Sequence, residues 1–301
     1  TRVRSSAASD VYKRQAYVND GMDPNTNGLG YHYDWGYDAQ GHPVLNSLTM
    51  KKYLDAAGTT PAADTDWFKE TTRTGVVQNY NVAVSSGSDR HSSYFSLGYY
   101  KNLGIIKSSD FDRYSARMNT EYKLIKDVLT IGEHFTLNRT SEVQAPGGFL
   151  ENVLQFNPSL PVYTERGDFA GPVGGYPDRE NPVARLSRNS HNRYTYWRTF
   201  GDAYVNLHLF KGFNLRSTFG LDYSQKQQRI FTFPVTEGTV ANPKNAVEAK
   251  QEHWTKWMWN AVATYNFETG KHHVDAMAGI ELNRQDAVSY THLRAHETPE
   301  H

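Results

Sequence analysis

The chain has 301 residues, with 32 lysines and arginines, 32 aspartates and glutamates, and no cysteine. The zero net charge gives no general attraction to nucleic acid, and the lack of cysteine excludes disulfides and thiolate metal sites. A mean hydropathy of −0.70 excludes a bundle of transmembrane helices, but it allows a transmembrane β-barrel, whose strands face lipid only at every second residue.

Both ends of the chain resemble sequencing adaptors. Residues 5–15 resemble the translation of a transposon-type adaptor, and residues 288–298 resemble the same adaptor end read on the opposite side. The alternative is that both are genuine tails. Because adaptor scars must be left out of fold reasoning, we expect residues 1–15 and 288–301 to be adaptor-derived and the rest to be an internal piece of a longer protein.

Residues 16–75 are predicted to be a loop region with one short helix. Residues 20–41 are rich in Gly, Asn, Asp and Tyr, and residues 59–66 form a linker of Pro, Ala and Asp. Between them, residues 49–57 are predicted to form a helix that ends at Gly58.

Within this region, residues 23–34 fit the pattern of a calcium-binding loop. Asp23, Asn25 and Asn27 place oxygen donors at loop positions 1, 3 and 5, Gly28 stands at position 6, and Asp34 at position 12. Aspartate replaces the usual glutamate at position 12, and no flanking helices are evident. The alternative is a surface loop rich in Asx turns. Calcium is the only cofactor predicted.

From Tyr80 onward, apolar and polar residues alternate with period two, which is the pattern of β-strands. Many of the segments are near the roughly nine to eleven residues that a tilted strand needs to cross a bilayer. Eight strands are predicted, at residues 76–86, 93–101, 111–122, 128–138, 200–209, 213–224, 253–267 and 273–283.

The two faces of these strands differ in charge. One face is apolar and carries one charged residue, Glu133, whereas the other holds residues such as Arg117, His134, Arg216 and Asp222. A Lys or Arg that faces lipid costs about 2–4 kcal/mol at the midplane, so a barrel wall requires such a charge-poor face. A soluble antiparallel fold also alternates, but its apolar face lies in the core.

The lengths of the connections favour the membrane barrel. Short and long connections alternate strictly, as in outer-membrane barrels with short periplasmic turns and long extracellular loops. A structureless loop of the length of 139–199 is also uncommon in a compact soluble domain. We therefore predict an all-β fold, a partial antiparallel transmembrane β-barrel. The connections are 87–92, 101–110, 123–127, 139–199, 211–212, 225–252 and 268–272.

Several motifs in this region, in their order and spacing, resemble the SusC/RagA family of TonB-dependent outer membrane transporters. The resemblance covers about residues 65–286, and it departs from the family at Ser86, where a glycine is usual. The motifs are Thr65-Asp-Trp67, Arg73-Thr-Gly75, residues 78–89, residues 94–100, residues 110–119, Pro158-Ser-Leu-Pro-Val-Tyr163, residues 211–222 and residues 259–265.

The resemblance implies part of a larger, plugged barrel of the roughly 22-stranded kind. Residues 76–287 would belong to the barrel, as about strands two to nine, and residues 16–75 to the first extracellular loop. It also implies import of oligosaccharides or peptides with a SusD-like surface lipoprotein, powered by TonB through an N-terminal region that precedes this piece. The implied surroundings are outer membrane lipid, and no nucleic acid partner is implied.

Two other functions remain open, a passive porin-like barrel and a soluble carbohydrate-binding β protein. No G-x-S-x-G motif or P-loop occurs, and no spacing pairs two carboxylates for hydrolysis, so we predict no enzyme activity and no catalytic residues. The long loop 139–199 contains five aromatic residues that could stack on sugar rings or line a peptide cleft, or else pack the loop itself. They are Phe149, Phe156, Tyr163, Phe169 and Tyr176.

Overall fold

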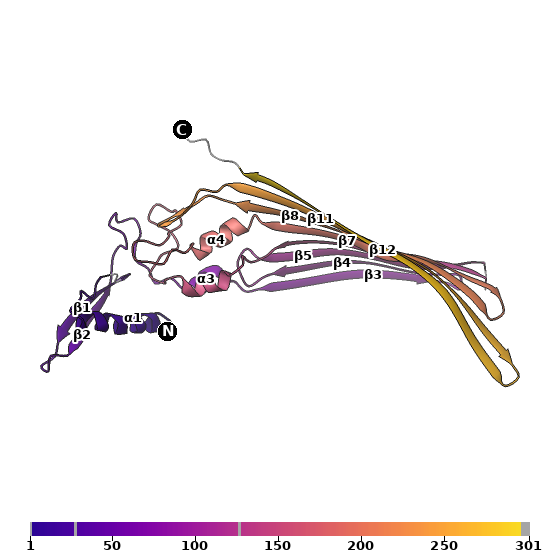
Figure 1. The fold of residues 1–301 in the computed structure, drawn as a ribbon, viewed down its shortest axis with the longest axis horizontal. Helices are drawn as coiled ribbons and strands as arrows, with labels where there is room; N and C mark the ends of the chain where they lie inside the picture. The colour runs from indigo at the N-terminus through magenta and orange to yellow at the C-terminus, as the bar shows by residue number, and fades with distance from the viewer. Residues whose placement is uncertain (1, 27–28, 126–127, 296–301) are drawn as a thin grey trace.

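A computed structural model describes residues 2–26, 29–125 and 128–295. Its main feature is a long, twisted antiparallel sheet of eight strands, each paired with its neighbours in chain order (Figure 1). Each predicted strand corresponds to one observed strand. The strands are β3 (Val76–Gly87), β4 (His91–Leu103), β5 (Asp110–Ile125), β6 (Leu129–Val143), β7 (Arg193–Phe210), β8 (Phe213–Thr232), β11 (Ala246–Thr269) and β12 (His272–Ala295).

The register aligns the predicted apolar residues in rows across the sheet. Val82 pairs with Leu97, Leu97 with Ala116, and Ala116 with Leu137. Since alternate residues of a strand point to the same side, successive rows build one continuous apolar face. We call this the outer face and the opposite one the inner face.

Most strands are longer than predicted, and the added residues bring charges onto the outer face. β6 runs on to Val143, β7 begins at Arg193, and β12 continues through residues 288–295. Backbone pairing does not depend on side-chain identity, so this continuation is compatible with an adaptor origin of residues 288–295. The prediction of a single charged residue on the apolar face is therefore wrong. Besides Glu133, the outer face carries Lys101 and Asp112, which lie within the predicted strands. The added residues contribute Asp110, Arg139, Arg193, Arg229, Arg284 and Asp286.

The charged outer-face residues nearest the middle of the strands have partners. Glu133 accepts a hydrogen bond from the Thr120 hydroxyl of the neighbouring strand. Arg284 forms an ion pair with Asp286, with 2.9 Å between guanidinium nitrogen and carboxylate oxygen. Pairing lowers the cost of placing each charge on an apolar surface.

The connections divide the sheet into two unlike ends. At the short-turn end the chain reverses at residues 88–90, around residue 128, at 211–212 and at 270–271. At the long-loop end the connections are 104–109, 144–192 and 233–245. The predicted alternation of short and long connections is therefore present.

Residues 16–75 differ from the prediction. After α1 (Arg2–Asn19), a hairpin of β1 (Tyr31–Tyr37) and β2 (Pro43–Met50) lies apart from the main sheet (Figure 1). The helix predicted at 49–57 is wrong, because Thr49 and Met50 end β2 and pair with His32 and Tyr31. A nine-residue helix has little stability of its own, so strand pairing prevails. The short helix of this region is α2 (Trp67–Thr71).

The long loop is not structureless. It contains α3 (Phe149–Gln155) and α4 (Pro182–Asn189), and the next long loop contains a hairpin of β9 (Val235–Glu237) and β10 (Val240–Asn242). In the part of the chain that the structure describes, no helix is long and apolar enough to cross a membrane.

Met118 and Asn119 are adjacent in β5 and test which face meets lipid. Met118 lies in an outer row with Val84, Phe95 and Phe135. Met118→Lys should lower the free energy of unfolding in lipid vesicles by about 2–4 kcal/mol, because it brings an unpaired charge into the apolar band. The measurement is a urea titration of the receptor that carries this chain. Asn119→Lys, which points inward, is the control, and equal losses for the two variants would contradict the assignment of the faces.

Candidate functional site

The long-loop end is closed by an ordered assembly, the loop cap, which consists of residues 52–75, 144–192 and 233–245. Its centre is an apolar cluster in which Trp67 meets Phe156 edge to face, with 4.8 Å between ring centroids. The cluster draws residues from α2, α3, α4 and the segments between them, so burial of apolar surface holds the cap together. Its buried members are Trp67, Phe149, Val153, Phe156, Leu160, Tyr176 and Leu186.

Hydrogen bonds from the Thr65-Asp66-Trp67 motif tie the segment before β3 to the long loop. The Trp67 indole N–H donates to the Asn157 carbonyl at 3.1 Å, and the Thr65 hydroxyl donates to the Leu160 carbonyl at 2.6 Å. The Asp66 carboxylate accepts from the Lys69 N–H at 3.1 Å and so caps α2. The motif thus fixes the long loop against the start of the barrel strands.

Asn181 and Glu237 join the two long loops. The fully buried Asn181 side chain donates to the carbonyls of Val162 and Ala170 at 2.9 and 2.8 Å, and its oxygen caps α4. Glu237 is 3% exposed, accepts from the Asn181 N–H, and forms an ion pair with Arg188. Removal of either buried side chain would leave polar groups without partners.

A second tie runs from the segment after β2 to the long loop. The Tyr53 hydroxyl donates to the Glu165 carboxylate at 2.7 Å, and this hydrogen bond raises the pKa of Tyr53 from its ordinary value. Nearby, the Thr59 hydroxyl and the N–H groups of Thr59 and Thr60 donate to Asp55 and lower the pKa of its carboxyl group. The Glu165 N–H in turn donates to the Thr59 carbonyl.

The loop aromatics separate into two groups. Phe149, Phe156 and Tyr176 are buried in the cluster, which matches the interpretation that they pack the loop. Tyr163 and Phe169 stack on each other, with 5.2 Å between ring centroids, and half of the Tyr163 surface is exposed. Of the five loop aromatics, Tyr163 is therefore the one with the most exposed side chain.

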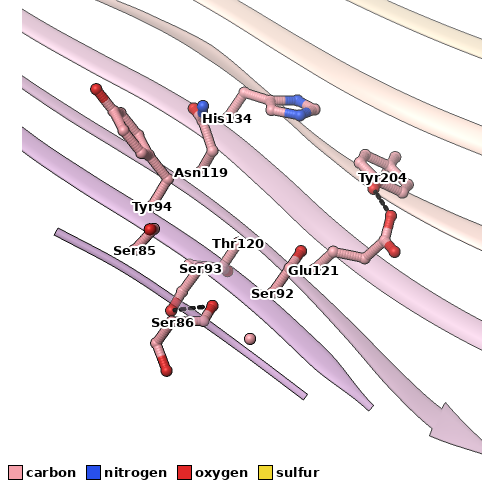
Figure 2. A pocket seen from close by; sticks show the side chains of 11 residues that line it. Ser85, Ser86, Ser92, Ser93, Tyr94, Asn119, Thr120, Glu121, His134 and Tyr204 are labelled. Atoms are coloured by element: carbon pink, nitrogen blue, oxygen red, sulfur yellow. Dashed lines mark hydrogen bonds between the residues drawn. The ribbon is translucent and has the colours of Figure 1, made fainter. Parts of the chain in front are cut away.

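The inner face has an open hollow of about 540 Å³ near the short-turn end (Figure 2). Tyr204 of β7 lies flat over Gly132, where an added Cβ atom would come within 2.5 Å of its ring. The Tyr204 hydroxyl donates to Glu121 at 2.6 Å (Figure 2), and the Arg216 guanidinium lies 3.8 Å from the Tyr204 ring centroid. Glycine at 132 thus allows the tyrosine to reach across the sheet.

Serine hydroxyl groups and a histidine also line this hollow. His134 lies 3.2 Å from the Asp202 carboxylate and stacks against the Tyr204 ring. Ser85 and Ser92 border the opposite side (Figure 2). These groups can donate and accept hydrogen bonds along a polar wall. His134 was predicted only as an inner-face residue, because Glu121, Gly132 and Tyr204 come together only through the strand register.

The predicted calcium loop is partly described. Asn25 uses its whole carboxamide on the backbone of Tyr33, donating to the carbonyl at 3.1 Å and accepting from the N–H at 2.7 Å. Asp23 accepts from the Asn25 N–H at 2.9 Å, which is an Asx turn. Asp34 is exposed on β1, and Asn27 lies outside the described residues. This geometry favours the Asx-turn alternative, and calcium binding stays a prediction. Among the described residues, no three His, Asp or Glu side chains cluster as metal ligands.

The sequence of the chain matches characterised receptors over most of its length. It is 27% identical over 225 residues to TonB-dependent receptor P26 of Formosa agariphila, covering 73% of this chain and 22% of that receptor. It is 24% identical over 243 residues to TonB-dependent receptor SusC of Bacteroides thetaiotaomicron, covering 73% of this chain and 24% of SusC. No family model matches the chain.

Solved structures share the fold. The RagAB peptide transporter superimposes with a TM-score of 0.62 at 20% identity, over 77% of this chain and 27% of that one. The RagAB peptide importer in its open-open state also gives a TM-score of 0.62. The eight-stranded sheet thus matches part of the RagA barrel in fold.

In sequence and in fold the chain is similar to TonB-dependent receptors of the SusC/RagA type. It spans about a quarter of the length of the receptors that it matches. Receptors of this type are outer membrane proteins and are not enzymes. In outer-membrane barrels the apolar face of the wall faces lipid and the polar face lines the interior.

Trp67→Ala tests whether the cap depends on its apolar cluster. The substitution should cost the cap about 3–5 kcal/mol, because it removes a buried aromatic side chain and leaves a cavity. Limited proteolysis of the intact receptor should then show faster cleavage within residues 165–180, while the barrel keeps its heat-modifiable gel mobility. Tyr163→Ala, a change in a half-exposed aromatic of the same loop, is the control. Unchanged cleavage in Trp67→Ala would show that the cap is held by other contacts.

Proposed function

We propose that this chain is part of the wall and the extracellular cap of a transporter that imports oligosaccharides or peptides through the outer membrane. The observation that carries the proposal is the eight-stranded sheet, which has an apolar outer face, a hydrogen-bonding inner face and an alternation of short and long connections. In outer-membrane barrels the short turns are periplasmic. The long-loop end, and with it the cap, would therefore face the outside of the cell.

The cap suits a surface where a partner protein closes over the barrel. Its central apolar cluster is buried, and its surface exposes Leu150 and Leu154 of α3 together with Tyr163, which stacks on Phe169. The RagAB structures are named as peptide importers, and on that analogy we propose a SusD-like surface lipoprotein as the partner of the cap. TonB would act through a region that precedes this piece, so the piece itself would supply the wall and loops.

Energy dependence separates this proposal from a passive porin. Cells that express the receptor and its lipoprotein should take up a fluorescent oligopeptide or oligosaccharide, and a protonophore should abolish uptake, because TonB draws on the inner-membrane gradient. Uptake measured with each labelled substrate then identifies the substrate class. Continued uptake in de-energised cells would favour the porin. Recovery of the folded receptor in aqueous buffer without detergent would favour the soluble carbohydrate-binding protein.

We further propose that residues 16–75 form the first extracellular loop, that residues 76–287 belong to the barrel, and that residues 1–15 and 288–301 are adaptor-derived. Long-read sequencing of the source DNA should show plug-coding sequence upstream, further strands downstream and a neighbouring lipoprotein gene. Neither adaptor segment should occur in the genome. A reading frame that stops near residues 16 and 287 would overturn these boundaries.

A further inference from the structure

A band of basic residues lies on the outer face at the long-loop end of β4–β8. Arg139 follows Leu137 on the outer face of β6, and Arg193 and Arg229 lie beyond it on β7 and β8. Lys101 of β4 lies on the same side. The acidic residues among them are Asp110 and Asp112, so the band is net positive.

The depth of this band matches the outer membrane surface. The rise from Leu129 to Arg139 is about 33 Å along the strand at roughly 3.3 Å per residue. For a strand tilted by roughly 45°, this is about 23 Å along the membrane normal, close to the roughly 25 Å height of the apolar band of such barrels. Arg139 would therefore lie where lipid headgroups begin. Its row across the sheet contains Tyr80, Tyr99, Tyr114 and Trp197, a girdle of interfacial aromatics.

The cations of the band are incompletely neutralised by the protein. Arg193 lies 3.1 Å from Asp110, and both Arg139 and Arg193 lie 3.9 Å from Asp112. Among the described residues, Lys101 and Arg229 form no ion pair. In addition, Arg193 and Arg229 are direct cross-strand partners, an arrangement that is destabilising for like charges. An anion bound between them would remove this repulsion.

An apolar groove of about 530 Å³ lies directly below the band, on the membrane side. It is lined by Val82, Leu97, Tyr99, Tyr114, Leu137 and Trp197, and Arg139 stands at its edge with its guanidinium 5.7 Å from the Trp197 ring centroid. A cationic edge above an apolar groove complements a ligand with an anionic head and a hydrocarbon chain.

We propose that this part of the outer face binds the phosphate headgroup of an anionic lipid of the outer leaflet. Arg139, Arg193 and Arg229 contact the phosphate, and one acyl chain lies in the groove beneath. The inference rests on the proposed barrel, in which the outer face meets lipid. Arginine suits the role because its planar fork matches phosphate oxygens.

The test uses the receptor that carries this chain, purified from outer membranes in mild detergent, with phosphatidic acid as the probe and native mass spectrometry as the readout. Arg139→Gln combined with Arg193→Gln should weaken phosphatidic acid binding by about five-fold for each charge removed. Arg229→Gln breaks no ion pair and should also weaken phosphatidic acid binding, so it provides the test if the double variant fails to fold. Arg113→Gln, at the same height on the inner face, is the matched control and should bind as the parent does.

Three comparisons decide the outcome. Diacylglycerol with the same chains should bind far more weakly than phosphatidic acid, and equal binding would reduce the site to an apolar groove. Inorganic phosphate alone should not compete at concentrations comparable to the lipid, and competition would indicate a free-anion site. A loss in Arg113→Gln equal to that in Arg229→Gln would overturn the assignment. Energised uptake is measured in parallel, so failure of lipid binding with intact uptake rejects this site and leaves the transport function standing.

Discussion

The antiparallel hydrogen-bond ladder is the constraint on which the rest of the structure depends. In hydrocarbon each backbone N–H and C=O group needs a partner within the protein, and neighbouring strands supply it. The ladder also fixes register, and a slip of one residue would turn the apolar face inward. In the described part of the chain, β3 and β12 pair on one side only. Such edges are untenable in lipid, so the proposed barrel requires further strands.

In the loop cap, many backbone N–H and C=O groups have no neighbouring strand as a hydrogen-bond partner. Side chains provide these hydrogen bonds instead. Asn181 donates to two backbone carbonyls and accepts from two backbone N–H groups. Trp67 and Thr65 bind carbonyls of the long loop just before the chain enters β3. The cap and β3 are therefore positioned together, so a movement of the long loop would also displace the start of β3.

Period-two alternation predicted the eight strands and their order, because half of each strand must face lipid. The alternation did not predict the strand ends, where neither face needs to be apolar. Beyond Arg139 the next three residues of β6, 140–142, are polar on both faces, so the pattern disappears although the ladder continues to Val143. The long loop was predicted without structure because its cluster joins Trp67 to residues far away in sequence, which no local pattern records. The Tyr204–Glu121 pair was missed for the same reason, since only the register brings the two residues together.

Charges are balanced less completely at the long-loop end of the outer face than on the inner face. On the inner face, cations lie beside anions, as in the Arg198–Asp222 pair, whose two nitrogen–oxygen distances are 3.0 and 2.6 Å. At the long-loop end of the outer face, Arg193 pairs with Asp110 but also lies directly opposite Arg229, which forms no ion pair among the described residues. Like charges that are direct cross-strand partners destabilise the sheet. The missing negative charge is then best supplied from outside the protein, and at this depth the anions at hand are lipid phosphates.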